Sequence, residues 1–354
     1  AQDVRGIDVN EDGFDVDLNV DLAQRDWFDL KMRLRLGDVT ISVRDALEAI
    51  ANGQDYVEVG GVWVRLDGER VRSLAVLLEE ARTLVPWDGD GIRLTPMQVG
   101  IVDMLASASD RVSLSDAWRS RIAPLRGGST DTGLPPIASL SSILRPYQRR
   151  GHAWLTARLA GGIGGILADD MGLGKTVQIL SAVAALRAEK SEDARAPVLV
   201  VAPTSVVGVW IEQARHFMPA LSVRAVTETV TRRGTTIAQE VMGADIVVTS
   251  YTLARLEAQQ WNRVSLGGIV IDEAQAVKNP RTATYRALRD LEAPWKLAVS
   301  GTPIENSLSD PWSLLSLTCP GLLPPWDVFQ QRVRRPIENG VDPSMLERLS
   351  AYVA

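Results

Sequence analysis

The 354-residue chain contains a single cysteine, Cys319. One cysteine excludes an internal disulfide, and one thiol cannot form a zinc cluster. The sequence also lacks eighteen consecutive apolar residues and therefore predicts no membrane-spanning helix. Its first residues, AQDVRGIDVNEDGFDVD, lack the basic segment and apolar core of a signal peptide. These absences predict a soluble protein of a reducing compartment, the cytoplasm.

Acidic charge predominates, with a net charge of −6, and it is unevenly distributed. Residues 1–100 carry 20 acidic and 11 basic side chains, whereas the remainder carries 24 and 27. The negative total argues weakly against a nucleic-acid partner. Because the excess acidity belongs to the first third, the rest of the chain can still present a basic face.

Residues 1–125 combine strand and helix patterns, which predicts a small α+β module with a helical part from Thr95 to Leu125. Alternating apolar and polar residues predict strands in FDVDLNVDL and WFDLKMRLRLG. YVEVGGVWVRLDG predicts a hairpin that turns at Gly60-Gly61. SVRDALEAIANG and SLAVLLEEARTLV are typical of helices. Gly, Ser and Pro in RGGSTDTGLPP then predict a linker over residues 126–141.

From residue 142 to 354, short apolar runs alternate with helical segments. Runs without polar alternation are typical of strands buried on both faces, and strand-helix alternation predicts an α/β fold with a parallel sheet flanked by helices. Ligands bind such sheets at the carboxyl ends of the strands. The expected strands are GGILA, VLVVAP, LSVRAV, DIVVTSY, GGIVID and KLAVSG.

The loop DDMGLG follows the first of these strands and precedes a helix that begins KTVQIL. Gly172 and Gly174 let backbone amides approach phosphate oxygens, and the helix N-terminus adds partial positive charge. Lys175 would reach the β- and γ-phosphates, and Thr176 would offer its hydroxyl to Mg²⁺. The alternative is an ordinary connecting loop with a solvated lysine. The general pattern also requires a glycine where this chain has Asp169.

An acidic pair ends the strand GGIVID, 97 positions beyond Lys175. Asp272 could hold Mg²⁺, and Glu273 could act as the general base that polarises water. Taken alone, two acids at a strand end are often structural. The next strand, KLAVS, is expected to lie beside the acidic strand. It leads to Ser300 and Thr302, which would sense the γ-phosphate, although Ser-Gly-Thr-Pro is also an ordinary turn.

Gln148 lies about twenty residues before the glycine-rich loop. Its carboxamide could read the edge of adenine through one donor and one acceptor. A single glutamine on a helix is more often solvated.

The ordered set of motifs resembles the first RecA-like lobe of Swi/Snf-type ATPases of helicase superfamily 2. The resemblance is carried by LRPYQRRGHAWL, LADDMGLGKT, VLVVAPTSVVGVWIEQARHF, DIVVTSYTLAR, IDEAQAVKNP and SGTPIENSLSDPWSLL. Trp210 occupies a position that is typical of the family. An acid at Asp169 is the family's own pattern, and Gln275, in place of the more common histidine, is similar to bacterial members. The module of residues 1–125 resembles, more loosely, an accessory region of some bacterial members.

The resemblance implies an ATPase with ATP and Mg²⁺ as cofactors. Glu273 and Lys175 would be catalytic, Thr176 and Asp272 would hold the metal, and Gln275, Ser300 and Thr302 would couple the site to movement. The implied cofactor-binding residues are Gln148, Asp170, Met171, Gly172, Leu173, Gly174, Lys175 and Thr176.

Double-stranded DNA is the partner that the resemblance implies, bound through phosphate contacts that are sequence-independent and salt-sensitive. Ordinary turn chemistry or a solvated lysine explains each candidate equally well. The candidates are Thr204, Ser205, Ser250, Tyr251, Lys278 and Asn279. DNA binding would associate the protein with the nucleoid.

A complete motor of this family has a second RecA-like lobe in cis, which supplies an arginine to the γ-phosphate. Arginine fingers contribute about 10³–10⁵ in rate. No sequence for that lobe is recognised within the 354 residues, so we expect this chain alone to be nearly inactive.

Two other functions remain open: a helicase that separates RNA or DNA strands, and a nucleotide-switched scaffold. The scaffold would bind a protein such as RNA polymerase, and residues 1–125 could carry that contact. A dinucleotide-binding enzyme is disfavoured because GLGKTV lacks the third glycine of Gly-x-Gly-x-x-Gly.

Overall fold

The protein divides into two compact units, residues 1–123 with 321–354 and residues 124–320. Among the residues described, no helix is both long and apolar enough to cross a membrane. The computed structural model describes residues 9–10, 14–24, 27–36, 39–52, 54, 56–59, 62–65, 68–85, 87–88, 91–126, 133–191, 195–302, 308–340, 346–347 and 349–350.

The N-terminal unit is built on a sheet with strand order β7-β8-β3-β2-β9, in which β4 also pairs with β3. A separate three-stranded sheet has the order β1-β6-β5. The strands of this unit are β1 (Val9–Asn10), β2 (Asp15–Gln24), β3 (Trp27–Leu36), β4 (Val39–Ser42), β5 (Tyr56–Val59), β6 (Val62–Arg65), β7 (Trp87–Asp88), β8 (Gly91–Leu94) and β9 (Arg111–Leu114).

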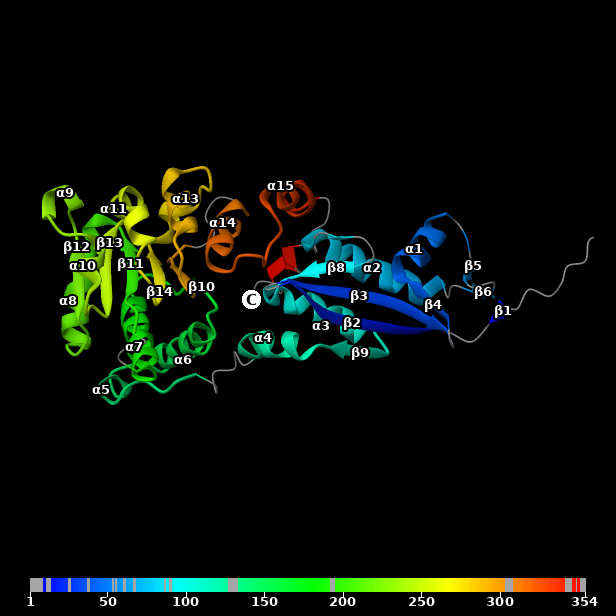
Figure 1. The fold of residues 1–354 in the computed structure, drawn as a ribbon, viewed down its shortest axis with the longest axis horizontal. Helices are drawn as coiled ribbons and strands as arrows, with labels where there is room; N and C mark the ends of the chain where they lie inside the picture. Colours follow the sequence, from blue (N-terminus) through cyan, green and yellow to red (C-terminus); the bar gives the residue numbers. More distant parts are fainter. Residues whose placement is uncertain are drawn as a thin grey trace, which may run out of the picture. The chain divides into compact units, whose positions relative to one another are not determined.

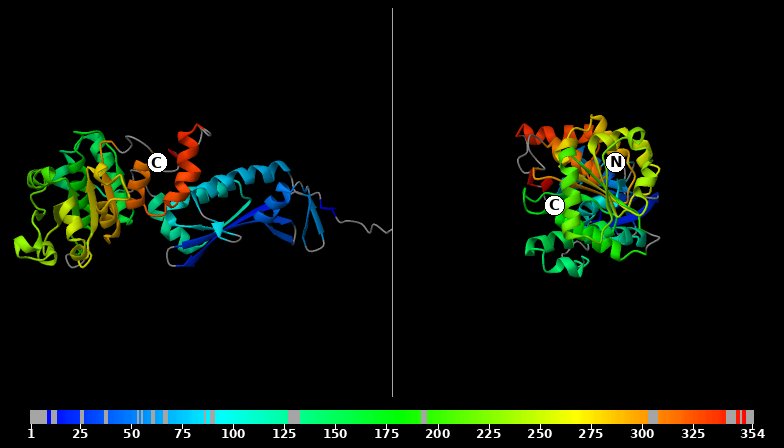
Figure 2. Two further views of the ribbon diagram at one scale, coloured as in Figure 1. Left: turned by 90° about the horizontal axis from the view of Figure 1, so that it is seen from above. Right: turned by 90° about the vertical axis from the view of Figure 1, so that its left-hand side faces the viewer.

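Strands β2 and β3 confirm the predicted alternation. Val16 and Leu18 of β2 are buried, while Asp15 and Asp17 on the other face bind Arg35 of β3 at 2.6 and 2.9 Å. Helix α2 runs along this sheet (Figure 2). The helical segments of the unit are α1 (Val43–Ala51), α2 (Gly68–Leu84), η1 (Pro96–Gln98), α3 (Val99–Ser107), most of α4 (Asp116–Arg126), α15 (Trp326–Phe329), the π-helical η4 (Gln330–Arg334) and α16 (Arg335–Glu338).

Most predicted elements of this unit are confirmed, including helices α1 and α2 and the antiparallel β5–β6 hairpin. The expected turn at Gly60-Gly61 lies outside the described residues. The segment predicted to be helical from Thr95 to Leu125 contains η1, α3 and α4, but β9 lies between α3 and α4 and was not predicted. Strand β9 pairs in parallel with β2, about a hundred residues earlier in the chain, and local sequence does not reveal so distant a partner.

The second unit contains a six-stranded parallel sheet with the order β10-β15-β14-β11-β13-β12. All six predicted strands are present. They are β10 (Gly165–Leu167), β11 (Val198–Ala202), β12 (Val223–Val226), β13 (Ile246–Ser250), β14 (Gly268–Asp272) and β15 (Lys296–Val299). The helical segments are α5 (Ala138–Ser141), α6 (Pro146–Ala160), α7 (Lys175–Ala188), α8 (Thr204–Phe217), α9 (Val230–Arg233), α10 (Ile237–Val241), α11 (Tyr251–Leu256), α12 (Ala258–Trp261), η3 (Ala274–Val277), α13 (Ala283–Asp290) and α14 (Ser309–Thr318).

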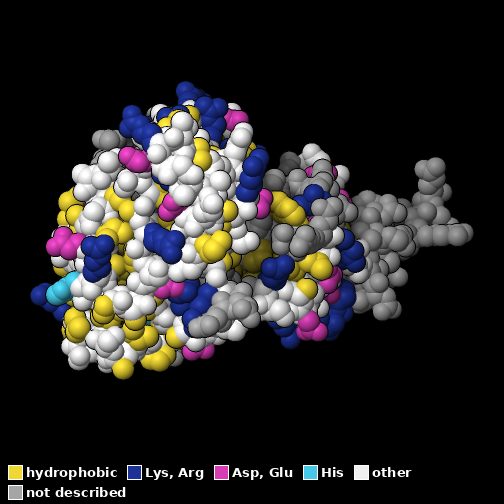
Figure 3. Space-filling view, turned by 60° about the vertical axis from the view of Figure 1, so that its left-hand side comes forward, with side chains coloured by type: hydrophobic (Ala, Val, Ile, Leu, Met, Phe, Trp, Pro, Cys, Tyr) yellow, Lys and Arg dark blue, Asp and Glu magenta, His cyan; other side chains and the backbone are white. Residues whose placement is uncertain are grey.

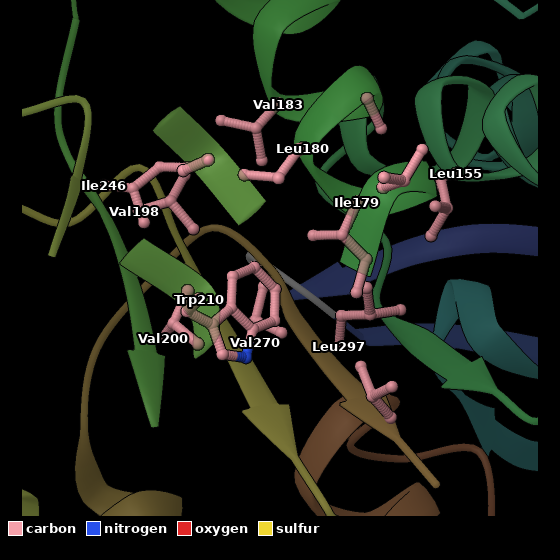
Figure 4. Packing of buried hydrophobic residues seen from close by; sticks show 14 of the residues in the cluster. Leu155, Ile179, Leu180, Val183, Val198, Val200, Trp210, Ile246, Val270 and Leu297 are labelled. Atoms are coloured by element: carbon pink, nitrogen blue, oxygen red, sulfur yellow. The ribbon is translucent and has the colours of Figure 1, made fainter. Parts of the chain in front are cut away.

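Successive residues of each central strand enter opposite cores. In β11, Val200 packs with α6, α7 and α8, whereas Leu199 and Val201 pack with α10, α12, α13 and α14. Figure 1 shows α6 and α7 on one side of the strands and α11 and α13 on the other, and Figure 4 shows the first core closely. A parallel sheet with helices on both faces is therefore the fold of this unit, as predicted.

The observed units differ from the expected module (1–125), linker (126–141) and lobe (142–354). The expected linker, residues 126–141, lies within the second unit. Its residues 127–132 are outside the described part, but Leu140 is fully buried and the Leu134 carbonyl bonds His152. Residues 321–354 group with the N-terminal unit, because α15 packs against α2 and Thr95 Oγ1 donates to the Gly321 carbonyl at 3.2 Å.

Candidate nucleotide-binding site

Three neighbouring strand ends bring the predicted motifs together. Strand β15 lies between β10 and β14, and Val299 is in register with both Leu167 and Asp272. The Ser300 amide continues the first pairing, donating to the Leu167 carbonyl at 3.2 Å. The glycine-rich loop, Ser300 and the acidic pair therefore emerge side by side at the carboxyl edge of the sheet. That is the edge where ligands bind in such folds.

The loop between β10 and α7 turns on two glycines in the left-handed backbone region. Gly172 has a φ of 83° and Gly174 a φ of 75°, conformations that suit glycine. A Cβ at Gly172 would meet no atom of the described chain within 4 Å, so its backbone faces open space. Gly174 caps the 14-residue helix α7. An open loop at the N-terminus of a long helix has the features of a phosphate cradle.

Lys175 is the first residue of α7, and its ammonium folds back onto the loop. Lys175 Nζ donates to the carbonyls of Asp169 and Asp170 at 2.7 and 3.0 Å. The Asp169 carboxylate in turn accepts from Gln178 Nε2 at 2.8 Å. Asp169, which replaces the usual first glycine, therefore anchors the loop to α7, and the Lys175 ammonium lies against the carbonyls of this loop.

The Asp272 carboxylate is buried and held at both oxygens. Oδ1 accepts from the Glu273 amide at 2.9 Å, and Oδ2 accepts from Trp210 Nε1 at 2.7 Å. Burial raises the pKa of Asp272, an effect opposed by these two donors and by the charge of Lys175. Glu273 has a φ of 49°, the one positive value among described non-glycine residues. Such strain occurs at functional sites.

A chain of hydrogen bonds joins the acidic pair to the loop after β15. Gln275 Nε2 donates to Glu273 Oε2 at 2.6 Å, and Ser300 Oγ donates to Gln275 Oε1 at 3.2 Å. The Thr302 amide donates to Ser300 Oγ at 3.1 Å, and Lys278 Nζ donates to the Thr302 carbonyl at 2.9 Å. The three predicted coupling residues thus form one connected set with Glu273.

The donors available for a metal ion are hard oxygen atoms, the hydroxyl of Thr176 and the carboxylate of Asp272. Within the described residues, no group of three or more His, Cys, Asp or Glu side chains could enclose an ion. A single carboxylate with one hydroxyl suits Mg²⁺, which keeps several waters and takes further ligands from substrate phosphates. The donor set therefore fits the predicted metal.

Gln148, the predicted adenine-reading residue, is buried, and both ends of its carboxamide have partners within the protein. Its Oε1 accepts from the Arg145 amide at 2.9 Å, and its Nε2 donates to the Leu173 carbonyl at 3.1 Å. Tyr147 donates to the same carbonyl. A Cβ at Gly174 would lie 2.5 Å from Gln148 Nε2. The glutamine therefore caps α6 and supports the glycine-rich loop. Met171, in the same loop, is 66% exposed.

The predicted nucleic-acid residues end or follow β11, β13 or β14 and so lie at the same sheet edge. Thr204, Ser205 and Asn279 are exposed. Asn279 Oδ1 accepts from the Arg281 amide at 2.9 Å, and the side chains of Ser250, Tyr251 and Lys278 also have partners within the protein. Ser250 Oγ caps α11, Tyr251 donates to the Asp272 carbonyl at 2.6 Å, and Lys278 Nζ is 3.3 Å from Asp310.

Sequence reasoning did not anticipate several supporting side chains. The sequence motif identifies Trp210 but does not predict its bond to Asp272, which is 62 positions away. The sequence also does not predict roles for Gln178 of α7 and Asp310 of α14. A glutamine on the buried face of a helix and an acid in the first turn of a helix are both common, so neither residue is a specific sequence signal. Only the folded chain shows which motif each one contacts.

The model of the SNF2-related domain family matches residues 147–353. The chain belongs to this SNF2-related family. The match places it among the Swi/Snf-type members of helicase superfamily 2, as the sequence motifs indicated.

Relatives of this family match over much of the chain. A Bacillus subtilis protein named "Putative ATP-dependent helicase/translocase YwqA" is 32% identical over 92% of this chain and 36% of its own length. The TATA-binding protein-associated factor MOT1 of Saccharomyces cerevisiae is 32% identical over 70% of the chain and 14% of its own length. The chain thus spans about a third of YwqA and less of MOT1.

Solved SNF2 structures share the fold. The Sulfolobus solfataricus SWI2/SNF2 ATPase core in complex with double-stranded DNA is 34% identical, with a TM-score of 0.52. The match covers 59% of this chain and 42% of that structure. The Sulfolobus solfataricus SWI2/SNF2 ATPase core domain is 35% identical and matches with the same TM-score.

Proposed function

We propose that this chain binds ATP with Mg²⁺ and forms the first lobe of an ATP-driven double-stranded DNA translocase. One observation carries the proposal: the glycine-rich loop, the Asp272-Glu273 pair and Ser300 emerge from adjacent strand ends. The family adds support, since a related ATPase core has been solved in complex with double-stranded DNA. Such a motor would act on DNA in the cytoplasm, at the nucleoid.

Binding of ATP would rearrange the loop. Lys175 would leave the carbonyls of Asp169 and Asp170 for the β- and γ-phosphates, and the amides near Gly172 and Gly174 would bind phosphate oxygens. Mg²⁺, held through Thr176 and Asp272, would offset charge on the phosphates. Residues 170–174 complete the cradle, with Gln148 supporting it from α6.

Hydrolysis would depend on Glu273, which would take a proton from the attacking water. Gln275 orients the Glu273 carboxylate at 2.6 Å, and Ser300 holds Gln275. Loss of the γ-phosphate would therefore be transmitted from Glu273 to Thr302 through two side chains. A glutamine at position 275 performs this coupling without titrating near neutral pH, unlike a histidine.

We further propose that turnover requires an arginine from a second RecA-like lobe in cis. Hydrolysis would then open and close two lobes and step the protein along one strand of the duplex. A protein partner would bind the N-terminal module, residues 1–125.

DNA would cross the carboxyl edge of the sheet and contact the protein through its phosphates. Thr204, Ser205 and Asn279 are exposed there, whereas Ser250, Tyr251 and Lys278 would act by shaping the backbone around them. Figure 3 shows Lys and Arg side chains spread over one face of this lobe, with acidic residues scattered between them. Phosphate contacts of this kind weaken steeply as salt rises.

The test is ATPase activity of the chain joined to its second lobe, measured with duplex DNA, single-stranded DNA and RNA at several salt concentrations. We expect duplex DNA to stimulate most, with stimulation falling as salt rises. Preference for single strands or RNA would favour a strand-separating helicase. ATP-dependent capture of RNA polymerase, without nucleic-acid stimulation, would favour a switched scaffold.

A further inference from the structure

The carboxylate of Asp272 receives a hydrogen bond from a side chain on a different element, helix α8. Trp210 Nε1 donates to Asp272 Oδ2 at 2.7 Å, and the Glu273 amide donates to Oδ1 at 2.9 Å. An indole N–H can only donate, and a bond from it to a carboxylate is charge-assisted. The two donors fix the plane of the carboxylate and leave its other lone pairs for a ligand.

Core packing fixes the direction of the Trp210 N–H. The ring is 1% exposed and belongs to the cluster that includes Val200 of β11 and Val270 of β14. Figure 4 shows the ring beside these two side chains, with its nitrogen at the edge of the group. Because a closely packed ring cannot turn without displacing its neighbours, the donor is held in place before any ligand arrives.

Two other tryptophans show that burial alone does not explain this bond. Trp118 and Trp261 are at most 1% exposed, yet their Nε1 atoms find no hydrogen-bond partner among the residues that the structure describes. The fold therefore tolerates a buried indole without an acceptor. The donor of Trp210 differs because it is aimed at the carboxylate expected to hold Mg²⁺.

We propose that Trp210 is a positioning residue that orients the Asp272 carboxylate for Mg²⁺ and so supplies part of the Mg²⁺-dependent affinity for nucleotide. This inference rests on the proposed ATP site. Terminal torsions of aspartate are broad, and without the indole donor the carboxylate would sample several orientations. Hydrogen bonds to metal-ligating groups are typically worth 10–100-fold in metal affinity.

The experiment measures the dissociation constant of a fluorescent, non-hydrolysable ATP analogue in excess Mg²⁺ and in excess EDTA. The ratio of the two constants isolates the contribution of the metal from that of the phosphate cradle. The variants are Trp210→Phe, which removes the donor, and Trp261→Phe, which makes the same change at a tryptophan without an acceptor. A third protein carries benzothienylalanine at position 210, which keeps the ring shape and lacks the N–H.

We expect both position-210 variants to lower the Mg²⁺ enhancement by about 10-fold or more, with unchanged affinity in EDTA. Trp261→Phe should keep the wild-type enhancement. A wild-type ratio in the benzothienylalanine protein, or an equal loss in Trp261→Phe, would overturn the inference and leave the bond a purely structural one. A wild-type chain that binds no analogue in either condition would instead overturn the proposed function, and this inference with it.

Discussion

At the scale of single residues, the proposed function gives different tasks to Lys175 and Glu273. Lys175 is held by two loop carbonyls that ATP would replace, so its charge would serve binding. Glu273 accepts a hydrogen bond from Gln275 and has a strained backbone conformation, and as the proposed general base it would serve the reaction of water. The two residues should therefore separate binding from turnover.

Glu273→Gln should preserve ATP affinity in the two-lobed protein and lower turnover by about 10²–10⁴-fold, since the general base is lost. Lys175→Ala should weaken ATP binding itself. The exposed Lys190, beyond the other end of α7, provides the matched lysine-to-alanine control. Binding by calorimetry and single-turnover hydrolysis would separate the effects. Equal loss of affinity in Glu273→Gln would contradict the assignment.

At the scale of elements, the packing of α6 against α7 supports the glycine-rich loop. Gln178 of α7 reaches Asp169 through the space that Gly151 of α6 leaves open. Buried His152 of α6 bonds the Leu134 carbonyl at 2.8 Å and Ser181 of α7 at 2.9 Å. The carbonyl can only accept, so Nε2 carries the proton and Nδ1 accepts from Ser181.

Gly151→Ala should destabilise the protein by about 1–3 kcal/mol, because its Cβ would overlap Gln178 Oε1. Gly208→Ala on α8 is the control. Its Cβ would meet no atom of the described chain within 4 Å, so the change should stabilise the helix by about 0.5–1 kcal/mol. Denaturant unfolding measures both. If Gly151→Ala were as stabilising as Gly208→Ala, the close approach of Gln178 to Gly151 would not contribute to stability.

The stability of this helix pair should fall in acid. Burial lowers the pKa of His152 below its ordinary 6.5, so the folded state binds fewer protons than the unfolded state just below that pH. The stabilisation is complete above pH 6.5 and is lost as pH falls toward the lowered pKa, by up to about 1.4 kcal/mol per pH unit. Urea unfolding at a series of pH values would measure this.

His152→Gln should remove that part of the pH dependence. His216→Gln, at an exposed histidine, should retain it. Identical pH profiles for wild type and His152→Gln would show that His152 is not the group responsible.

At the scale of the whole molecule, the proposed ATPase lobe would supply the groups that bind ATP and activate water. The chain covers 42% of the related Sulfolobus core. We expect residues 1–354 alone to hydrolyse ATP about 10³–10⁵-fold more slowly than the chain joined to its second lobe, the range that an arginine finger contributes. Steady-state ATPase assays with duplex DNA measure the difference. Comparable rates would mean that this chain supplies every catalytic group itself.

Local patterns predicted much of the site. The strands of the ATPase lobe, the two turning glycines and the Asp272-Glu273 pair were all readable, because apolar runs, glycine turns and strand ends depend on neighbouring residues. The register that sets Val299 beside both Leu167 and Asp272 was predicted in part, since the strand before Ser300 was expected beside the acidic strand.

The sequence by itself determined a parallel α/β lobe with phosphate-binding and acidic motifs in the order typical of its family. The tertiary structure alone decided that β9 joins β2 and that residues 321–354 group with the N-terminal unit. It also placed the Trp210 donor on Asp272. Each of these contacts joins residues far apart in the chain, and such partners are selected by burial and hydrogen bonding across the whole fold rather than by local preference.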